Sequence, residues 1–228
     1  MKLTEIHIEE LYKFTKKHYV EHYDVQTELV DHLANDIEQI WVENPSLSFE
    51  EARDKSFKKF GIFGFMDVIE AKQKQMSKKY TKILFKFIKE WFRLPKIIIT
   101  ATIFITFYTV IQSHISKGIV FTTLLFVASY EMYLVWKRRK KLKKEEKVFL
   151  LESMIKQTSA GFTTLTLINA LNFINIADIE FNKLSLFWIL FWALLLTLCI
   201  IVSYIVNVIL PEKSEELLEE TYPEYKIS

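Results

Sequence analysis

The chain has 228 residues, of which 50% are hydrophobic and 25% are charged. Lys and Arg number 30 and Asp and Glu number 28, but the near-neutral balance hides a strong segregation. Residues 1–71 and 211–228 are acidic, residues 72–96 are basic, and residues 97–210 are mostly apolar. A single cysteine, Cys199, excludes a disulfide framework and a CxxC site. The first residues lack the basic start and apolar run of a cleavable signal peptide.

Residues 1–71 predict an acidic cytosolic module built from helices. A first helix fits Thr4 to Lys17, with Thr4 as its N-cap. A second helix begins at Asp24, because apolar residues then recur at spacings of three and four. Ser48 and Glu51 have the spacing of a capping box and predict the start of a third helix.

The stretch KKFGIFGFMD, residues 58–67, holds two of the four glycines in the chain. A P-loop requires GxxxxGK[ST], and a dinucleotide fingerprint requires a third glycine after a strand, so neither is present. One glycine follows the third helix, where a left-handed C-cap favours glycine, and the other precedes a new helical pattern. We interpret the stretch as a tight turn that phenylalanines bury. The residues expected to maintain the turn and core of the module are Trp41, Phe57, Phe60, Gly61, Gly64 and Phe65.

Residues 72–96 predict a basic amphipathic helix that ends before Pro95. Its apolar and basic faces are separated, as is typical of helices at an anionic membrane surface. A continuous helix leading into the first membrane span is a compatible alternative. Direct nucleic-acid binding is disfavoured, because the acidic module would repel phosphate. The basic face consists of Lys78, Lys82, Lys86, Lys89 and Arg93.

The apolar part of the chain predicts membrane spans, since about 20 consecutive apolar residues suffice to cross a bilayer. The segment before the first span and the loop at 136–147 are rich in Lys and Arg, which places both termini in the cytosol. The expected fold class is therefore all-α, with a cytosolic helical module followed by a four-helix transmembrane region and an acidic cytosolic tail, residues 211–228. The four predicted spans are residues 97–115, 119–136, 159–176 and 184–210.

Three amides, Asn169, Asn172 and Asn175, recur every three residues along the third predicted span. Amides are disfavoured against lipid, so we expect this stripe to face protein. One interpretation is hydrogen bonding between helices, with Ser203 or Asn207 of the fourth span as partners. The other is that the amides line a site or pathway for a small polar ligand.

The remaining ionisable residues predict no catalytic site. His18 and His22 are four apart, but they straddle the predicted end of the first helix, so we expect no metal site. Glu131 lies about one turn inside the second span. It either snorkels towards Lys137 or Arg138 or marks a coupling site. No nucleophile triad, carboxylate pair or glycine-rich loop is evident, so neither an enzyme nor a cofactor is expected.

The series ELVDHLANDIEQIW, NPSLSFEEARDKSFKKFGIFGF and MDVIEAKQKQMSKKY lies within residues 25–80. It resembles the N-terminal unit of the HAAS-type bacterial membrane proteins, in particular uncharacterised Bacteroidetes members. The resemblance implies a helical cytosolic module ahead of several membrane spans in the bacterial inner membrane. It also implies a signalling or regulatory protein, often encoded beside a PadR-type transcription regulator, and it brings no catalytic residues.

These observations give a leading hypothesis of a non-enzymatic regulatory membrane protein. Its module would dock a cytosolic partner such as a PadR-type regulator, and its basic face would meet anionic lipids. The alternative is a small transporter or ligand-binding membrane subunit that uses the polar residues of the third span. A structural subunit of a larger membrane assembly is a third hypothesis, and the sequence leaves a homo-oligomer open.

Overall fold

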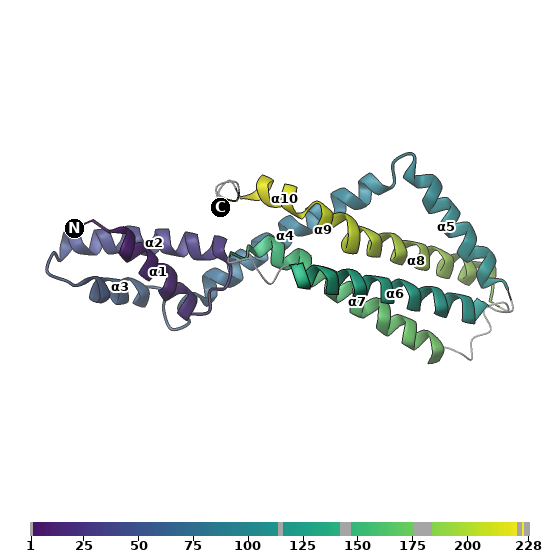
Figure 1. The fold of residues 1–228 in the computed structure, drawn as a ribbon, viewed down its shortest axis with the longest axis horizontal. Coiled ribbons are helices and arrows are strands. Elements are labelled where there is room, and N and C mark those ends of the chain that lie inside the picture. The colour runs from purple at the N-terminus through teal and green to yellow at the C-terminus, as the bar shows by residue number, and fades with distance from the viewer. Residues whose placement is uncertain (1, 114–115, 142–146, 176–183, 223–224, 226–228) are drawn as a thin grey trace. The chain divides into compact units, whose positions relative to one another are not determined.

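The computed structural model describes residues 2–113, 116–141, 147–175, 184–222 and 225. These residues form helices joined by turns, without a strand among them, so the all-helical prediction is confirmed (Figure 1). The chain divides into a first unit, Met1–Tyr80 with Glu145–Ser153, and a second unit, Thr81–Lys144 with Met154–Ser228. The helices are α1 (Glu5–Lys17), α2 (Tyr23–Glu43), α3 (Phe49–Lys58), α4 (Met66–Trp91), α5 (Lys96–Ile111), α6 (Ser116–Lys141), α7 (Leu150–Asn175), α8 (Leu186–Tyr204), the π-helical turn η3 (Ile205–Ile209), α9 (Leu210–Glu212) and α10 (Ser214–Thr221).

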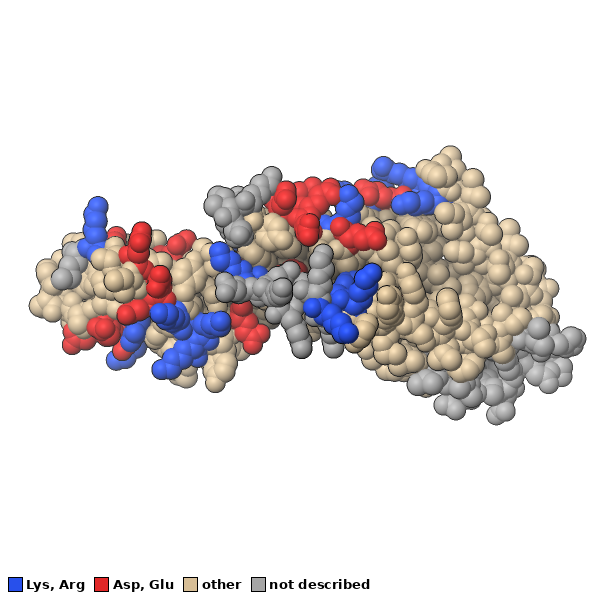
Figure 2. Space-filling model, viewed as in Figure 1, with Lys and Arg blue, Asp and Glu red and all other residues tan. Residues whose placement is uncertain are grey.

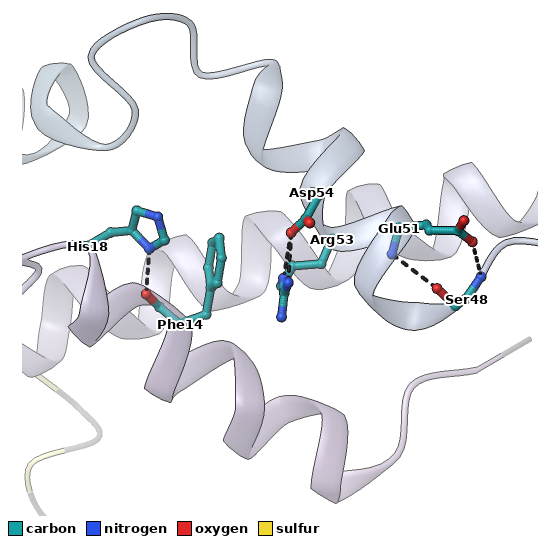
Figure 3. A network of polar contacts seen from close by, with 6 residues as sticks. All are labelled: Phe14, His18, Ser48, Glu51, Arg53 and Asp54. Carbon is teal, nitrogen blue, oxygen red and sulfur yellow. Dashed lines mark hydrogen bonds and ion pairs between the residues drawn. The ribbon is translucent and has the colours of Figure 1, made fainter.

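The first unit is a conventional helical core with polar caps. The predicted capping box is confirmed: Ser48 N donates to Glu51 Oε2 at 2.9 Å, and Glu51 N donates to Ser48 Oγ at 3.2 Å (Figure 3). Thr4 also caps α1 as predicted, since its side chain accepts from His7 N. Apolar side chains from α1, α2 and α3 are buried together, which fixes how these helices pack. They include Leu11, Val25, Leu29, Leu33, Ile37, Ile40, Trp41 and Ala52.

A distant segment completes the first unit. Tyr23 N donates to Val148 O at 2.8 Å, and Asp24 Oδ1 accepts from Leu150 N at 3.0 Å. The second bond caps the start of α7 with a carboxylate from α2. The first unit therefore differs from the predicted module 1–71, because it runs to Tyr80 and includes Glu145–Ser153. Local periodicity carries no information about such a contact between segments far apart in sequence.

The turn between α3 and α4 is left-handed at both glycines. Gly61 has a φ of 79° and Gly64 a φ of 57°. The Phe65 ring lies 4.9 Å from the Phe57 ring, so part of the turn is packed as expected. Phe63 differs, because 72% of it is exposed. It lies at the tip of the turn between the two glycines, where the chain reverses and its side chain points away from the core.

The second unit contains α5, α6, α7 and α8 (Figure 1). Glu131 and Arg138 of α6 contact Ser203 and Asn207 of the α8–η3 segment in the same chain order, so these two helices run parallel. Ser159 near the start of α7 contacts Asn207 near the end of the α8–η3 segment, so α7 runs antiparallel to both helices. An apolar cluster joins α5, α6 and α8: Phe107, Ile111, Val120, Leu124, Ile189, Ala193 and Leu196.

Much of the outside of the second unit is apolar. Figure 2 shows this face over α5, α6 and α8 almost free of Lys, Arg, Asp and Glu. Within the described residues, Gly118–Arg138 and Leu186–Glu212 are long and apolar enough to cross a membrane. A third crossing is obtained if α4 and α5, bent by 83° at their junction, form one broken span. The described part of the chain therefore has two or three helices of membrane-spanning length and composition.

Candidate functional site

Buried polar side chains gather inside the second unit, where α6, α7 and η3 approach one another. Glu131 is 3% exposed, Ser203 is 3% exposed and Asn207 is 1% exposed. These values matter because α6 and α8 are otherwise apolar helices, in which burying a carboxyl or an amide is costly without partners. We name this group the polar cluster; it consists of Glu131, Arg138, Ser159, Thr163, Thr166, Ser203 and Asn207.

Asn207 is the centre of the polar cluster. Its Oδ1 accepts from Ser159 Oγ at 2.6 Å and from Thr163 Oγ1 at 3.5 Å. Its Nδ2 donates to Ser203 Oγ at 3.5 Å. Asn207 lies in the middle of the π-helical turn Ile205–Ile209, a distortion that often occurs at functional sites.

One of the two carboxyl oxygens of Glu131 accepts a hydrogen bond within the polar cluster. Ser203 Oγ donates to Glu131 Oε1, while Glu131 Oε2 has no hydrogen-bond partner among the described residues. Thr163, Thr166 and Asn207 surround the carboxyl group. The expectation that Glu131 snorkels towards Lys137 or Arg138 is wrong, because its side chain turns inward instead. A carboxyl with a free oxygen in such surroundings can accept a proton or a hydrogen-bond donor.

Arg138 closes the other end of the polar cluster. Its Nη1 donates to Ser159 Oγ at 3.0 Å, and its Nη2 donates to the main-chain oxygen of Asn207. A chain of polar contacts therefore links the carboxyl of Glu131 through Ser203, Asn207 and Ser159 to a guanidinium. Because three helices contribute, a change in the charge of Glu131 would act on all of them.

The amides predicted on α7 lie elsewhere. Asn169 and Asn172 are exposed on the outside of α7, and Asn169 Nδ2 donates to Leu165 O of its own helix at 2.9 Å. The side chain of Asn175 lies outside the described residues. Of the four asparagines proposed as one polar site, the structure thus places Asn207 in the cluster and keeps Asn169 and Asn172 away from it.

The hydroxyls of α7 that do reach the cluster were missed from sequence. Ser159, Thr163 and Thr166 are spaced by four and three residues, so they share one helix face. Each Thr also donates to a main-chain oxygen of the preceding turn, as Thr163 Oγ1 does to Ser159 O at 3.0 Å. The spacing was a usable signal, but hydroxyls in apolar helices commonly bond their own backbone and point to no partner.

The predicted module residues lie in the core and the turn of the first unit, and the predicted basic face is exposed on α4 and just after it. Trp41 and Phe65 are each 2% exposed, whereas Phe57 and Phe60 are half-buried. The indole of Trp41 donates to Leu47 O at 3.1 Å, which fastens α2 to the loop before α3. All members of the predicted basic face, Lys78, Lys82, Lys86, Lys89 and Arg93, are exposed.

No arrangement in the described part of the chain places three or more His, Cys, Asp and Glu side chains around a common metal position. His18 lies among aromatic rings: its Nδ1 is 2.9 Å from Phe14 O, and its ring centroid is 4.5 Å from that of Phe57 (Figure 3). Beside it, Arg53 pairs with Asp54 at 2.8 Å and covers the Phe14 ring (Figure 3). This group of side chains packs the first unit together.

Comparison with known proteins returned no match: no family model, no curated protein and no solved structure resembles the chain. The polar cluster is therefore the feature on which a functional argument rests.

Proposed function

We propose that the chain is a non-enzymatic, multi-pass membrane protein with a regulatory role. In this proposal the polar cluster is the input inside the membrane, and the helical first unit is the output that docks a cytosolic partner. The observation that carries it is the course of α7. The first turn of this helix belongs to the first unit, and the same uninterrupted helix supplies Ser159 and Thr163 to the cluster.

The proposal has four crossings of the bilayer, and the direction of the helices supports this number. If α6 and α8 both cross and run parallel, the chain between them must return through the same thickness, and α7 is the helix that connects them. α5 has 16 residues and so a length of about 24 Å, which a locally thinned bilayer accommodates. α7 is not among the helices of membrane-spanning composition in the described part of the chain, because hydroxyls and amides interrupt its apolar residues.

The proposed orientation has both termini in the cytosol of a bacterium, with the spans in its inner membrane. It rests on the Lys and Arg residues of the segment before α5 and of residues 136–147, at the end of α6 and after it. α4 would lie along the membrane surface, since it turns by 83° into α5 and leaves its basic face exposed. That face carries Phe85, 64% exposed, among its lysines, and anionic lipid headgroups are its natural counterpart.

Only a short length of α7 separates its cluster residues from its first turn, which belongs to the first unit. Ser159 follows Leu150 by nine residues on α7, which is about 14 Å of helix. Leu150 N is held by Asp24, and the Phe149 side chain beside it is 1% exposed. In this proposal, a shift or rotation of α7 when Glu131 gains or loses charge is passed along the helix to Leu150, whose main-chain N–H bonds Asp24.

The partner is proposed from the family resemblance alone: a cytosolic PadR-type transcription regulator, bound by the first unit. The rival function is a small transporter or ligand-binding subunit. In that function, Glu131 and Asn207 would contact the ligand in place of Asn169 and Asn172, because Glu131 and Asn207 are the buried pair. The regulatory function predicts that a substitution of Glu131 alters the first unit, whereas the transport function predicts no such change.

The test is hydrogen exchange on the full chain in lipid nanodiscs, comparing wild type with Glu131→Gln. A regulatory device predicts altered exchange of the amides in Leu150–Ser153, by about tenfold for a shift of roughly 1.4 kcal/mol in local stability. Leu194→Ala, on the exposed side of α8, is the control and should leave these amides unchanged. Unaltered exchange in Glu131→Gln would favour the transport hypothesis.

Affinity capture with wild type and Glu131→Gln is a second experiment. It shows whether binding of a cytosolic partner depends on the polar cluster.

A further inference from the structure

One oxygen of the polar cluster is left without a partner. Glu131 is 3% exposed, and its Oε2 has no hydrogen-bond partner among the described residues. Arg138, the cation of the polar cluster, donates to Ser159 Oγ at 3.0 Å and to the main-chain oxygen of Asn207. A charged carboxylate oxygen that is buried without a donor or a counter-ion is costly. The groups around Oε2 therefore indicate what this oxygen binds.

The hydroxyl groups beside Glu131 present hydrogen-bond acceptors to it. Thr163 and Thr166 lie next to the carboxyl group, and both are buried. Thr163 Oγ1 donates to Ser159 O at 3.0 Å. Thr166 Oγ1 donates to Phe162 O, also at 3.0 Å. A hydroxyl has a single hydrogen, so these two oxygens have only lone pairs left for Glu131.

A neutral carboxylic acid fits these contacts better than a carboxylate. Ser203 Oγ donates to Oε1 of Glu131, which therefore acts as an acceptor. A negative Oε2 would face the lone pairs of the threonine hydroxyls, whereas a protonated Oε2 donates to one of them. A proton also needs no added space, whereas Ca²⁺ and Mg²⁺ take about six oxygen ligands or more.

We propose that Glu131 is a proton-binding site and that α6, α7 and η3 meet around its neutral form, with Oε2–H donating to Thr163 or Thr166. A hydronium ion of the aqueous phase gives its proton to a lone pair of Oε2 and leaves as water. Loss of that proton replaces a hydrogen bond to α7 by repulsion between a negative oxygen and lone pairs. The assembled cluster is thus stable while Glu131 is protonated and weakens as the pH rises. The proton is then the input of the proposed regulatory function, on which this assignment rests for the place of the cluster in the membrane.

Few other charges face Glu131 from the helices packed around it. On α6, Arg138 lies about two turns further along the helix, within electrostatic reach of Glu212 of α9. On α8, the Cys199 thiol is within electrostatic reach of Glu131. On α7, the titratable residue nearest in sequence to the threonines is Lys156, about two turns before them. Glu131 is therefore the carboxyl to which a response of the polar cluster to pH is assigned.

Infrared difference spectroscopy on the full chain in lipid nanodiscs tests the protonation state, because a protonated carboxyl has a carbonyl band distinct from that of a carboxylate. At pH about 6, where exposed carboxyls are charged, wild type should have this band and Glu131→Gln should lack it. The band should disappear at alkaline pH. The matched control is Glu220→Gln, exposed on α10, which should keep the band.

Two results would overturn the proton site. One is the absence of the band from wild type at pH about 6, or its persistence in Glu131→Gln. The other is a carboxylate band of Glu131 that responds to added Na⁺ at constant pH, which would indicate a metal ion in place of a proton.

Hydrogen exchange of the amides in Leu150–Ser153 separates the proton site from the regulatory function. Glu131→Gln keeps an acceptor and gains an N–H donor, so it resembles the protonated residue. After correction for the intrinsic effect of pH on exchange, wild type and Glu131→Gln should agree at pH about 6 and differ by about tenfold at alkaline pH. If the band titrates while exchange stays equal at both pH values, the proton site stands and the regulatory function fails. If exchange differs but the band is missing, the regulatory function stands and the proton site is overturned.

Replacing both hydroxyls by methyl groups tests the direction of the hydrogen bond. Thr163→Val and Thr166→Val together remove the acceptors for Oε2–H and keep the shape of the side chains. They should weaken proton binding about tenfold, so that the band disappears about one pH unit lower. The matched control is Thr164→Val, whose hydroxyl bonds Ala160 O on the exposed side of α7, and it should leave the band unchanged. A band that persists to higher pH in the double variant would mean that the hydroxyls donate to a carboxylate, which contradicts the proposal.

Discussion

The two units of the chain differ in the side chains that they expose and in the ionisable groups that they enclose. In the first unit, Leu29 and Leu33 are fully buried and the charged residues face outward. In the second unit, Leu194 is 51% exposed, while Glu131 and Asn207 are enclosed. This difference is the one expected if the second unit lies in a bilayer, because burial of apolar area is favourable in water but not in hydrocarbon. Apolar packing dominates the core of the first unit, whereas the second unit combines an apolar cluster with buried polar contacts between α6, α7 and η3.

The largest predicted contrast uses one chemical change at two sites. Leu33→Ala removes a fully buried side chain from the first unit and should destabilise it by about 2–5 kcal/mol. Leu194→Ala makes the same change on the exposed side of α8 and should cost less than about 0.5 kcal/mol. Hydrogen exchange of α2 and of α8 in nanodiscs measures both. Comparable losses at the two sites would show that the outside of the second unit is not a lipid-facing surface.

The next contrast lies within the turn between α3 and α4. Gly64→Ala imposes a left-handed backbone on alanine and places its Cβ 2.9 Å from Phe57 Cζ, so it should cost about 2–3 kcal/mol. Gly61→Ala has the backbone cost alone, about 1 kcal/mol, because nothing lies within 4 Å of its Cβ. Exchange rates of α3 amides should rank the variants in this order. A reversed order would mean that the Phe57 ring moves aside without cost.

The smallest predicted effect concerns a surface ion pair of the first unit. Lys59 Nζ lies 2.5 Å from Asp36 Oδ1. Burial tends to raise the pKa of Asp36, but the hydrogen bond from Lys59, the nearby Ser56 hydroxyl and the lysine charges outweigh it and lower that pKa. Asp36→Asn should therefore cost less than about 1 kcal/mol at neutral pH.

The pH dependence of this pair has a definite sign. A lowered pKa in the folded state means that the contribution of Asp36 is complete above its unfolded pKa, near the ordinary 3.8. It disappears as the pH falls through the lower folded value. The difference in stability between wild type and Asp36→Asn should thus be constant near neutrality and vanish in strong acid. A difference that grows on acidification would rule out the ion pair as its source.

Local features of the first unit were predictable because they depend on nearby residues. The capping box of Ser48 and Glu51 and the helices around it follow from spacing alone. The inward orientation of the Glu131 side chain could not be predicted in this way, because its partner Ser203 lies on another helix. Spacing also does not indicate the π-helical turn that contains Asn207. The expectation that phenylalanines bury the turn was right for Phe65 and wrong for Phe63, since composition does not say which ring the glycines direct outward.

The discontinuous first unit imposes an order on biosynthesis. Residues 1–80 leave the ribosome before α5 and α6, yet the segment around Val148, Phe149 and Leu150 that completes their packing is translated only after α6. Until then Tyr23 and Asp24 lack the main-chain partners they contact in the finished protein. The first unit therefore reaches its final form only after α5 and α6 have been synthesised, and a ribosome stalled before Val148 would leave an N-terminal domain without its closing segment.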